Sequence, residues 1–313
     1  MDTSKRTYNF FIDGSFSDAP KECLPKLKDA NLRDIAIGFS KNFDDMSELA
    51  ALPLKLAFIG LTGQREMMNF MAACMRSNRS ATKYGKDPEA TKVINDEMAK
   101  VRDEEETKKW ISDNANDIVS NVFQMPDMRP TVRILLLSLL SSSWTLFEAL
   151  SSDLWINLVN ARPVQLGSSV IANLPDQHDG QEFDSRGVSL RVLAKHSFDL
   201  SKALGTLLSK RFDFTSLSGI KRAYKSAFPE IGLDIFDNPE LRLLQAYRHV
   251  IVHRAGTADR SFIDTARLQN IVLGQPVPLE ERSAENMINA AAGCGTQLIS
   301  RLDDWLNRHP IQL

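Results

Sequence analysis

Cysteine is scarce in this sequence, and the three that occur, Cys23, Cys74 and Cys294, are far apart and odd in number. No Cys-x-x-Cys pair is present, so neither a disulfide framework nor a cysteine-based zinc site is expected. Reduced, buried thiols of a cytosolic protein fit this pattern best. We therefore expect a cytoplasmic location.

Long apolar runs are also missing. The N-terminal residues reach Asp13-Gly14 without the apolar stretch of a secretory signal, so export is not expected. The longest uncharged run, residues 134–147, contains four serines and a threonine. It falls short of the roughly 20 apolar residues that span a membrane. We expect a buried core helix here and no membrane partner.

An excess of charge of one sign is absent as well. The chain has 38 Lys and Arg against 40 Asp and Glu, a formal net charge of -2. No global basic field results, so a nucleic acid would have to be held by a local patch. Gly60-Leu61-Thr62-Gly63 is not a phosphate loop, because the Gly-Lys-Ser/Thr ending is missing.

Helical patterns dominate what is present. Apolar residues recur at helical spacing, with caps and breakers between the periodic segments. Beyond a small hairpin over residues 8–16 and two short extended pieces within residues 271–279, we expect little or no sheet, so the fold class is mainly α. The expected helices cover residues 47–76, 87–123, 131–160, 188–210, 216–227, 238–253 and 283–307. Pro53, Gly60 and Gly63 are expected to break the first of these helices, and a break near Asp113-Asn114 is expected in the second.

One boundary stands out, because residues 125–130 contain two prolines between helical patterns. It divides the chain into residues 1–127, a mostly helical region of unknown role, and residues 128–313, a helical bundle domain. The helix over 131–160 is apolar nearly all round, which predicts a place in the middle of the bundle. Trp144, Trp155 and Trp305 are expected in the core, and residues 161–187 form a long surface loop.

The helix over residues 238–253 has two distinct faces. Its core face, an arc of about 120°, consists of Leu243, Leu244, Tyr247, Val250 and Ile251. The opposite arc, about 140° wide at helical spacing, gathers Arg242, Gln245, Arg248, His249, Val252 and His253. Its cationic side chains would suit an anion.

Arg248 and His253 are five positions apart, so their side chains diverge by about 140° on one helix. Two arrangements could bring them together. Two copies of the helix could meet across a twofold axis, so that each cleft receives both side chains from both copies. Alternatively, the helix could end at His253 and leave that residue free to swing.

This segment, continuing through Arg254-Ala255-Gly256 to Asp259, resembles the signature of the HEPN family. There an arginine, usually followed by a polar residue, precedes a histidine, and here His249 fills the polar position. The helix over 131–160 with Glu148, and the Gln275–Leu279 turn before a final helix, resemble the family as well. The resemblance covers about residue 130 to the C-terminus and implies a HEPN-like bundle.

The resemblance implies a homodimeric, metal-independent endoribonuclease that cleaves single-stranded RNA and needs no cofactor, in a toxin, antiviral or RNA-processing role. His253 would be the general acid/base and Arg248 would steady the phosphate, with His249, Glu148, Arg242 and Asp259 in support. A base takes the 2′-hydroxyl proton, the oxygen attacks phosphorus, and a cation offsets the developing charge. A protein regulator is a further possible partner, and no DNA specificity is indicated.

The same residues allow plainer interpretations. The basic face could be solvent-exposed or paired with Glu148, Asp153 and Asp259, and Glu148 could serve structure alone. A non-catalytic HEPN scaffold or sensor, binding RNA, a nucleotide or a protein, is the alternative function. A twofold cleft with both motifs exposed would favour the enzyme, whereas a buried or acid-neutralised His253 would favour the scaffold. The downstream tyrosine of HEPN toxins paired with nucleotidyltransferase antitoxins is absent, so that group is not assigned.

Overall fold

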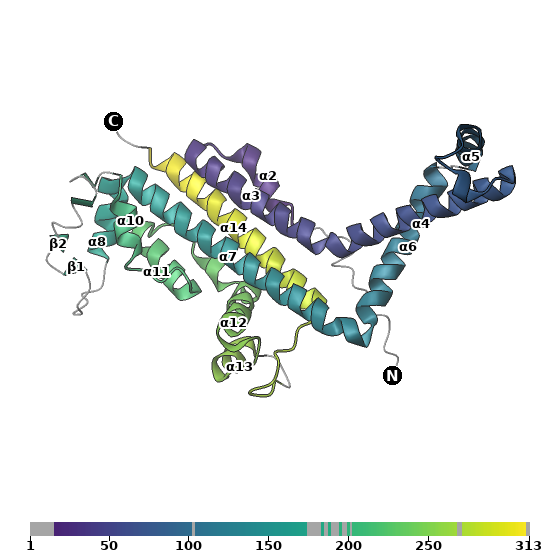
Figure 1. Ribbon diagram of the computed structural model, residues 1–313. Coiled ribbons are helices and arrows are strands. Elements are labelled where there is room, and N and C mark those ends of the chain that lie inside the picture. The colour runs from purple at the N-terminus through teal and green to yellow at the C-terminus, as the bar shows by residue number, and fades with distance from the viewer. Residues whose placement is uncertain are drawn as a thin grey trace. The chain divides into compact units, whose positions relative to one another are not determined.

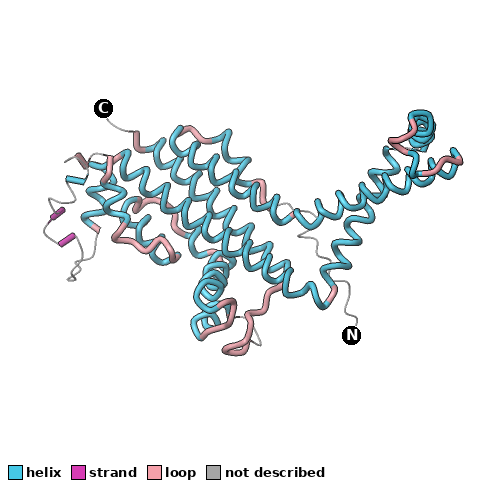
Figure 2. Tube along the Cα trace, in the orientation of Figure 1, coloured by secondary structure: helices cyan, strands magenta, loops and turns pink. Residues whose placement is uncertain are grey.

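The computed structural model describes residues 16–101, 104–173, 183–184, 187–188, 194–195, 199–200, 202–267 and 271–310. Within these residues the chain is almost entirely helical (Figure 2). The exception is one antiparallel pair of two-residue strands, β1 (Phe183–Asp184) and β2 (Gly187–Val188). The predicted mainly α class is confirmed. The predicted hairpin over residues 8–16 lies outside the described residues except for Phe16.

The described residues fall into two compact units. The first contains residues 47–134, and the second contains residues 16–46 together with those from 135 onward. This division differs from the predicted boundary after residue 127, which assigned residues 16–46 to the N-terminal region. The predicted two domains remain a prediction, because compactness alone does not show that either part folds by itself.

The first unit is built around α4 (Leu52–Ser77), which packs against α5 (Pro88–Val101) and α6 (Glu104–Gln124). Pro53 lies in the first turn of α4, where its missing N–H has no helical partner to lose. The predicted breaks at Gly60 and Gly63 are wrong, because α4 runs through both. A mid-helix glycine costs only about 1 kcal/mol relative to alanine, which packing along the helix can offset.

Asp87 starts α5, since its carboxylate accepts the backbone N–H groups of Glu89 at 3.0 Å and Ala90 at 3.2 Å. The predicted break near Asp113-Asn114 is wrong, because α6 is continuous there. The Asn114 side-chain amide donates to the carbonyl of Trp110 at 2.7 Å within the helix, so this polar residue does not compete with helix formation.

The second unit begins with α2 (Ala19–Cys23), the short turn η1 (Leu24–Lys26) and α3 (Ala30–Ala50). Within this unit, α3 up to Met46 lies beside α7 (Arg129–Ala161) and α14 (Glu281–Arg308) (Figure 1). The three helices meet closely at Gly295, where an added Cβ would come within 2.5 Å of Phe39 and 2.9 Å of Leu150. Only glycine allows this approach.

A buried carboxylate joins α14 to the start of α3. Asp303 accepts the backbone N–H groups of Lys28 at 3.1 Å and Asp29 at 2.9 Å, and Asp29 in turn accepts the N–H of Leu32. Helix N-termini leave N–H groups without intrahelical partners, and a carboxylate satisfies them well. This contact explains why residues 16–46 belong with the second unit.

The central helix α7 buries a broad face instead of its whole circumference. Trp144, Phe147 and Trp155 are fully buried, and Trp305 is 4% exposed, so the predicted tryptophan core is confirmed. Ile134, in contrast, is 64% exposed. The Trp155 indole donates to the carbonyl of Ala223 at 2.9 Å, which satisfies its polar atom inside the core.

By length and mean hydropathy, the segment Pro126–Ala161 could cross a membrane, and α3 with α4 passes the same test only as a broken pair. These are the candidates within the described residues. About 44% of the most apolar window of Pro126–Ala161 is buried in the protein. Core helices of soluble proteins have the same length and composition, so this property is weak support for a membrane span.

Between α7 and α14, two predictions are corrected. The predicted loop over 161–187 contains the π-helical turn η4 (Pro163–Gly167) and α8 (Ser168–Ala172). Of the described residues in the predicted helix over 188–210, those that are helical lie chiefly in α10 (Leu204–Ser209), and Val188 belongs to β2. Periodicity alone did not distinguish these short elements, because they depend on packing.

Two of the remaining helices agree with the predicted segments 216–227 and 238–253, whereas the turn over 234–237 and the helix over 260–266 were not predicted. Ser216 caps α11 (Leu217–Ala227), and its hydroxyl accepts the N–H of Gly219 at 3.2 Å. The turn η5 (Asp234–Asp237), the helix α12 (Pro239–Arg254) and the helix α13 (Arg260–Ala266) follow. The two extended pieces predicted within 271–279 correspond to an irregular segment that pairs with residues 256–258 through an isolated bridge.

Candidate functional site on helix α12

Local sequence fixes both ends of α12. Asn238 caps the start by accepting the N–H groups of Glu240 at 2.9 Å and Leu241 at 3.1 Å. After Arg254 the chain reverses through Ala255 at φ 51° and Gly256 at φ 75°. The helix therefore includes His253 in its last turn, and the alternative in which it ends at that histidine is wrong.

The predicted core face of α12 is confirmed at its centre. Leu244, Tyr247 and Val250 are buried, whereas Leu243 and Ile251 are half-buried. Burial also extends to Leu241 and Ala246, which the arc did not include. Tyr247 donates its hydroxyl to the carbonyl of Pro278 and packs edge-on against Phe262 at 5.0 Å between ring centres. The opposite face is thereby held toward solvent.

Arg248 lies against an acid from α7. Its guanidinium is 3.9 Å from the Glu148 carboxylate, and each side chain is 23% exposed. The same carboxylate accepts the indole N–H of Trp144 at 3.0 Å. At 3.9 Å the Glu148 carboxylate is too far for a hydrogen bond, so it offsets the charge of Arg248 mainly through space, and part of the guanidinium stays accessible.

Asp259 connects the end of α12 to the start of α13. One oxygen accepts the N–H of Phe262 at 2.8 Å and caps α13. The other lies 3.7 Å from the His249 ring nitrogen and 3.7 Å from the Arg254 guanidinium. These two separations are too long for hydrogen bonds, so Asp259 offsets the positive charge here mainly through space.

His253 is exposed, and among the described residues no hydrogen bond or ion pair engages its ring. Its ring centre lies 4.9 Å from that of His249, one turn earlier, with the rings tilted by 50°. Val252 beside it is also exposed, at 52%. Because α12 is helical through both residues, Arg248 and His253 point about 140° apart and do not converge within one chain.

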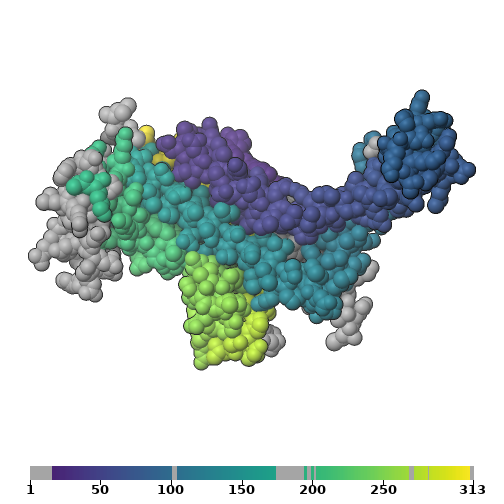
Figure 3. Space-filling model, in the orientation of Figure 1, coloured from purple at the N-terminus to yellow at the C-terminus, as the bar shows by residue number. Residues whose placement is uncertain are grey.

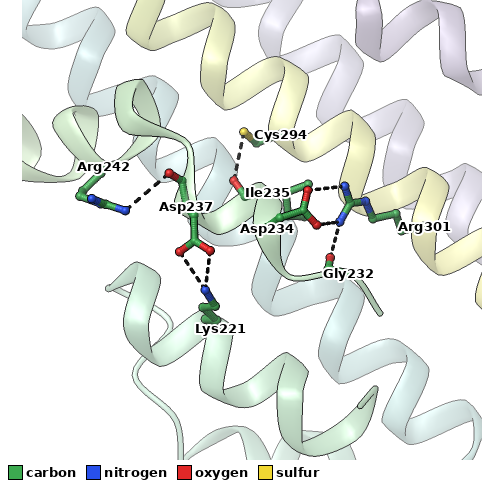
Figure 4. Close-up of polar contacts among 8 residues, drawn as sticks. All are labelled: Lys221, Gly232, Asp234, Ile235, Asp237, Arg242, Cys294 and Arg301. Carbon is green, nitrogen blue, oxygen red and sulfur yellow. Dashed lines mark hydrogen bonds and ion pairs between the residues drawn. The ribbon is translucent and has the colours of Figure 1, made fainter. Parts of the chain in front are cut away.

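Arg242 contacts the turn η5, and its predicted supporting role stays a prediction. Its guanidinium points to the carbonyl of Asp237 at 3.5 Å, and the Asp237 carboxylate accepts from Lys221 at 2.7 Å (Figure 4). Gln245, also on the basic face, accepts the N–H of Leu217 at 3.2 Å. The N-terminal half of the basic face therefore anchors α12 to η5 and α11, and only its C-terminal half is open.

The other side of η5 is held by α14. Arg301 forms a two-pronged ion pair with Asp234 and donates to the carbonyl of Gly232 (Figure 4). The hydrogen bonds from Arg301 lower the pKa of Asp234 from 3.8 to about 2. Nearby, burial raises the pKa of the Cys294 thiol to about 11, and its Sγ lies 3.5 Å from the carbonyl of Ile235. Sequence patterns gave no signal of this anchor.

Comparison with known proteins finds no matching family model, curated protein or solved structure.

Proposed function

We propose that this protein is a HEPN-type endoribonuclease that cleaves single-stranded RNA without a metal, as a homodimer. The observation that carries the proposal is the open C-terminal half of the α12 basic face. His253 is exposed there, with no described hydrogen bond or ion pair, and Arg248 is 23% exposed beside Glu148. An accessible proton carrier and a partly accessible cation are the groups that phosphodiester cleavage requires.

Dimerisation is part of the proposal because Arg248 and His253 diverge within one chain. A twofold axis near the end of α12 would place His253 of one copy toward Arg248 of the other. The exposed Val252 between them would then be covered in the dimer. His253 would take the 2′-hydroxyl proton, and Arg248 would offset charge on the attacked phosphate.

A non-catalytic HEPN scaffold or sensor is the second candidate, and a specific observation favours it. The open half of the basic face contains Arg248, His249 and His253. Acidic side chains lie near two of these residues, Glu148 near Arg248 and Asp259 near His249. Partial neutralisation suits a surface that binds RNA, a nucleotide or a protein without cleaving it. In either case a regulator bound to the same face would compete with RNA, and a cytoplasmic location is part of both proposals.

The deciding experiment is cleavage of a mixed single-stranded RNA pool in EDTA by the full-length protein. We expect products with 2′,3′-cyclic phosphate ends, and a loss of about 10²- to 10⁴-fold in His253→Ala and in Arg248→Ala. The controls are His309→Ala and Arg308→Ala, which remove the same residue types from the far end of α14 and its C-terminal flank. Equal activity in all five proteins, or none in the wild type, would eliminate the nuclease.

A further inference from the structure

The two histidines at the end of α12 share one side of the helix. His249 and His253 are four positions apart, a spacing that places side chains one above the other. Both are exposed, and the His249 side chain is 52% exposed. Figure 3 shows the yellow-green residues of α12 and α13 as a projection on the visible face of the protein.

Their separation matches that of two imidazoles on one metal ion. Zinc binds an imidazole nitrogen at about 2 Å, which puts the metal about 3.2 Å from the ring centre. Two rings at about 90–110° around the metal then have centres about 4.5–5.2 Å apart. The observed 4.9 Å between His249 and His253 falls inside this range, with a ring tilt of 50°.

We propose that His249 and His253 form a two-histidine chelate for a divalent transition-metal ion, namely zinc, nickel or copper. Imidazole suits these ions, whereas magnesium and calcium require oxygen ligands. Among the described residues no group of three or more His, Cys, Asp or Glu side chains is placed to hold a metal. Water therefore fills the other positions, and binding is weaker than at a structural zinc site with four protein ligands.

The charged side chains around the two histidines affect how strongly a cation binds there. The Asp259 carboxylate, 3.7 Å from the His249 ring nitrogen, favours a cation at this position. The positive charge of Arg254 disfavours a cation here, but Asp259 partly offsets that charge, because the same carboxylate lies 3.7 Å from the Arg254 guanidinium. Since one anion faces both groups, Asp259→Asn should weaken metal binding without removing a ligand.

The chelate would regulate the proposed nuclease, and this part rests on the proposed function. A metal ion occupies the nitrogen lone pair with which His253 would accept the 2′-hydroxyl proton. The metal is therefore an inhibitor, and an activity measured in EDTA should fall when zinc is added and return when EDTA is restored. Metal binding itself requires no nuclease activity.

The test is calorimetric titration of the untagged full-length protein with zinc and with nickel. We expect one site per chain, and a loss of affinity of about 10²-fold in His249→Gln and in His253→Gln, because each variant converts a two-point contact into one. His309→Gln is the matched control, since that ring stacks on Trp305 at 4.4 Å between ring centres and lies 3.4 Å from Glu230. Its binding should equal that of the wild type.

Copper resonance spectra provide a second readout and should show two equivalent nitrogens in the wild type and one in each single variant. Three outcomes would overturn the chelate: no zinc or nickel binding, equal binding in all variants, or a loss that follows His309→Gln. If the protein bound metal but cleaved no RNA, the chelate proposal would stand and only the nuclease proposal would be refuted. The two proposals can therefore fail separately.

Discussion

The two compact units differ in how much apolar side chain they bury. Among the largest fully buried side chains, Trp144, Trp155, Tyr224, Tyr247 and Phe147 all belong to the second unit, and Ile94 represents the first. The first unit instead has two small clusters, around Leu61 and Ile111 and around Ala73 and Cys74. Burial of apolar area is the main favourable term in folding, so the second unit should dominate stability.

The long helix α4 illustrates the contrast. It carries seven exposed large apolar side chains along its length, and both of its internal glycines have open space around them. On α14, by comparison, the glycine at position 295 is packed against two helices. A helix of similar length is thus sparsely packed in one unit and tightly packed in the other.

The largest expected difference is in amide hydrogen exchange. Regions with few buried apolar contacts open at lower free energy than the global unfolding of a core. Peptides from α4, α5 and α6 should exchange faster than those from α7, α12 and α14, by orders of magnitude. Mass spectrometry of the exchanging protein measures this, and equal protection in the two sets would contradict the comparison.

Matched leucine truncations should show a smaller contrast. Leu139→Ala, fully buried in α7, should destabilise by about 3–5 kcal/mol, whereas Leu61→Ala, 4% exposed in α4, should cost about 2–3 kcal/mol. The difference reflects how freely neighbours can relax around the cavity. Urea unfolding of the two variants followed by circular dichroism measures both losses. A larger loss of stability in Leu61→Ala than in Leu139→Ala would contradict the proposed difference between the two units.

Matched glycine substitutions should change the stability of the protein in opposite directions. Gly295→Ala should destabilise by about 1–3 kcal/mol, because its Cβ would meet Phe39 and Leu150. Gly63→Ala should stabilise by about 0.5–1 kcal/mol, because nothing lies within 4 Å of the added Cβ. Thermal unfolding midpoints of the two variants measure this, and a shift in the same direction for both would refute the assigned packing.

The smallest effect concerns acid stability of the second unit. The pKa of Asp234 is lowered to about 2 from 3.8, so its ion pair with Arg301 stabilises the protein above about pH 4. That contribution should be lost as the pH falls from about 4 to about 2. Asp234→Asn should flatten the stability profile in this window, and Asp264→Asn, an exposed acid on α13, should not. Urea midpoints at several pH values give the comparison.

Local sequence signals located most of the helices and their ends. The predicted helix starts at residues 87, 216 and 238 match α5, α11 and α12, which Asp87, Ser216 and Asn238 cap, because capping depends on residues only two or three positions away. The core tryptophans and the two faces of α12 also follow from spacing alone. These features are determined within one or two helical turns, which is why a sequence reveals them.

The candidate site was predictable only in part. The motif identified Arg248, His249 and His253, and the sequence offered Glu148 and Asp259 as possible acidic partners, but the fold decides which acid lies near which residue. Glu148 lies on α7, a hundred positions before Arg248, and its contact with that arginine depends on how two helices pack. The use of Arg242 as an anchor to η5 depends on a turn that no sequence pattern indicated.

The sequence by itself determined that this chain is mainly helical, where its capped helices begin, and which face of α12 is basic. Only the tertiary structure decided that α4 continues through Gly60 and Gly63, that Asp303 joins α3 to α14, and that Glu148 lies beside Arg248. Caps and periodicity act between near neighbours. Helix packing, charge pairing and burial act between segments that are distant in sequence and meet only in the folded chain.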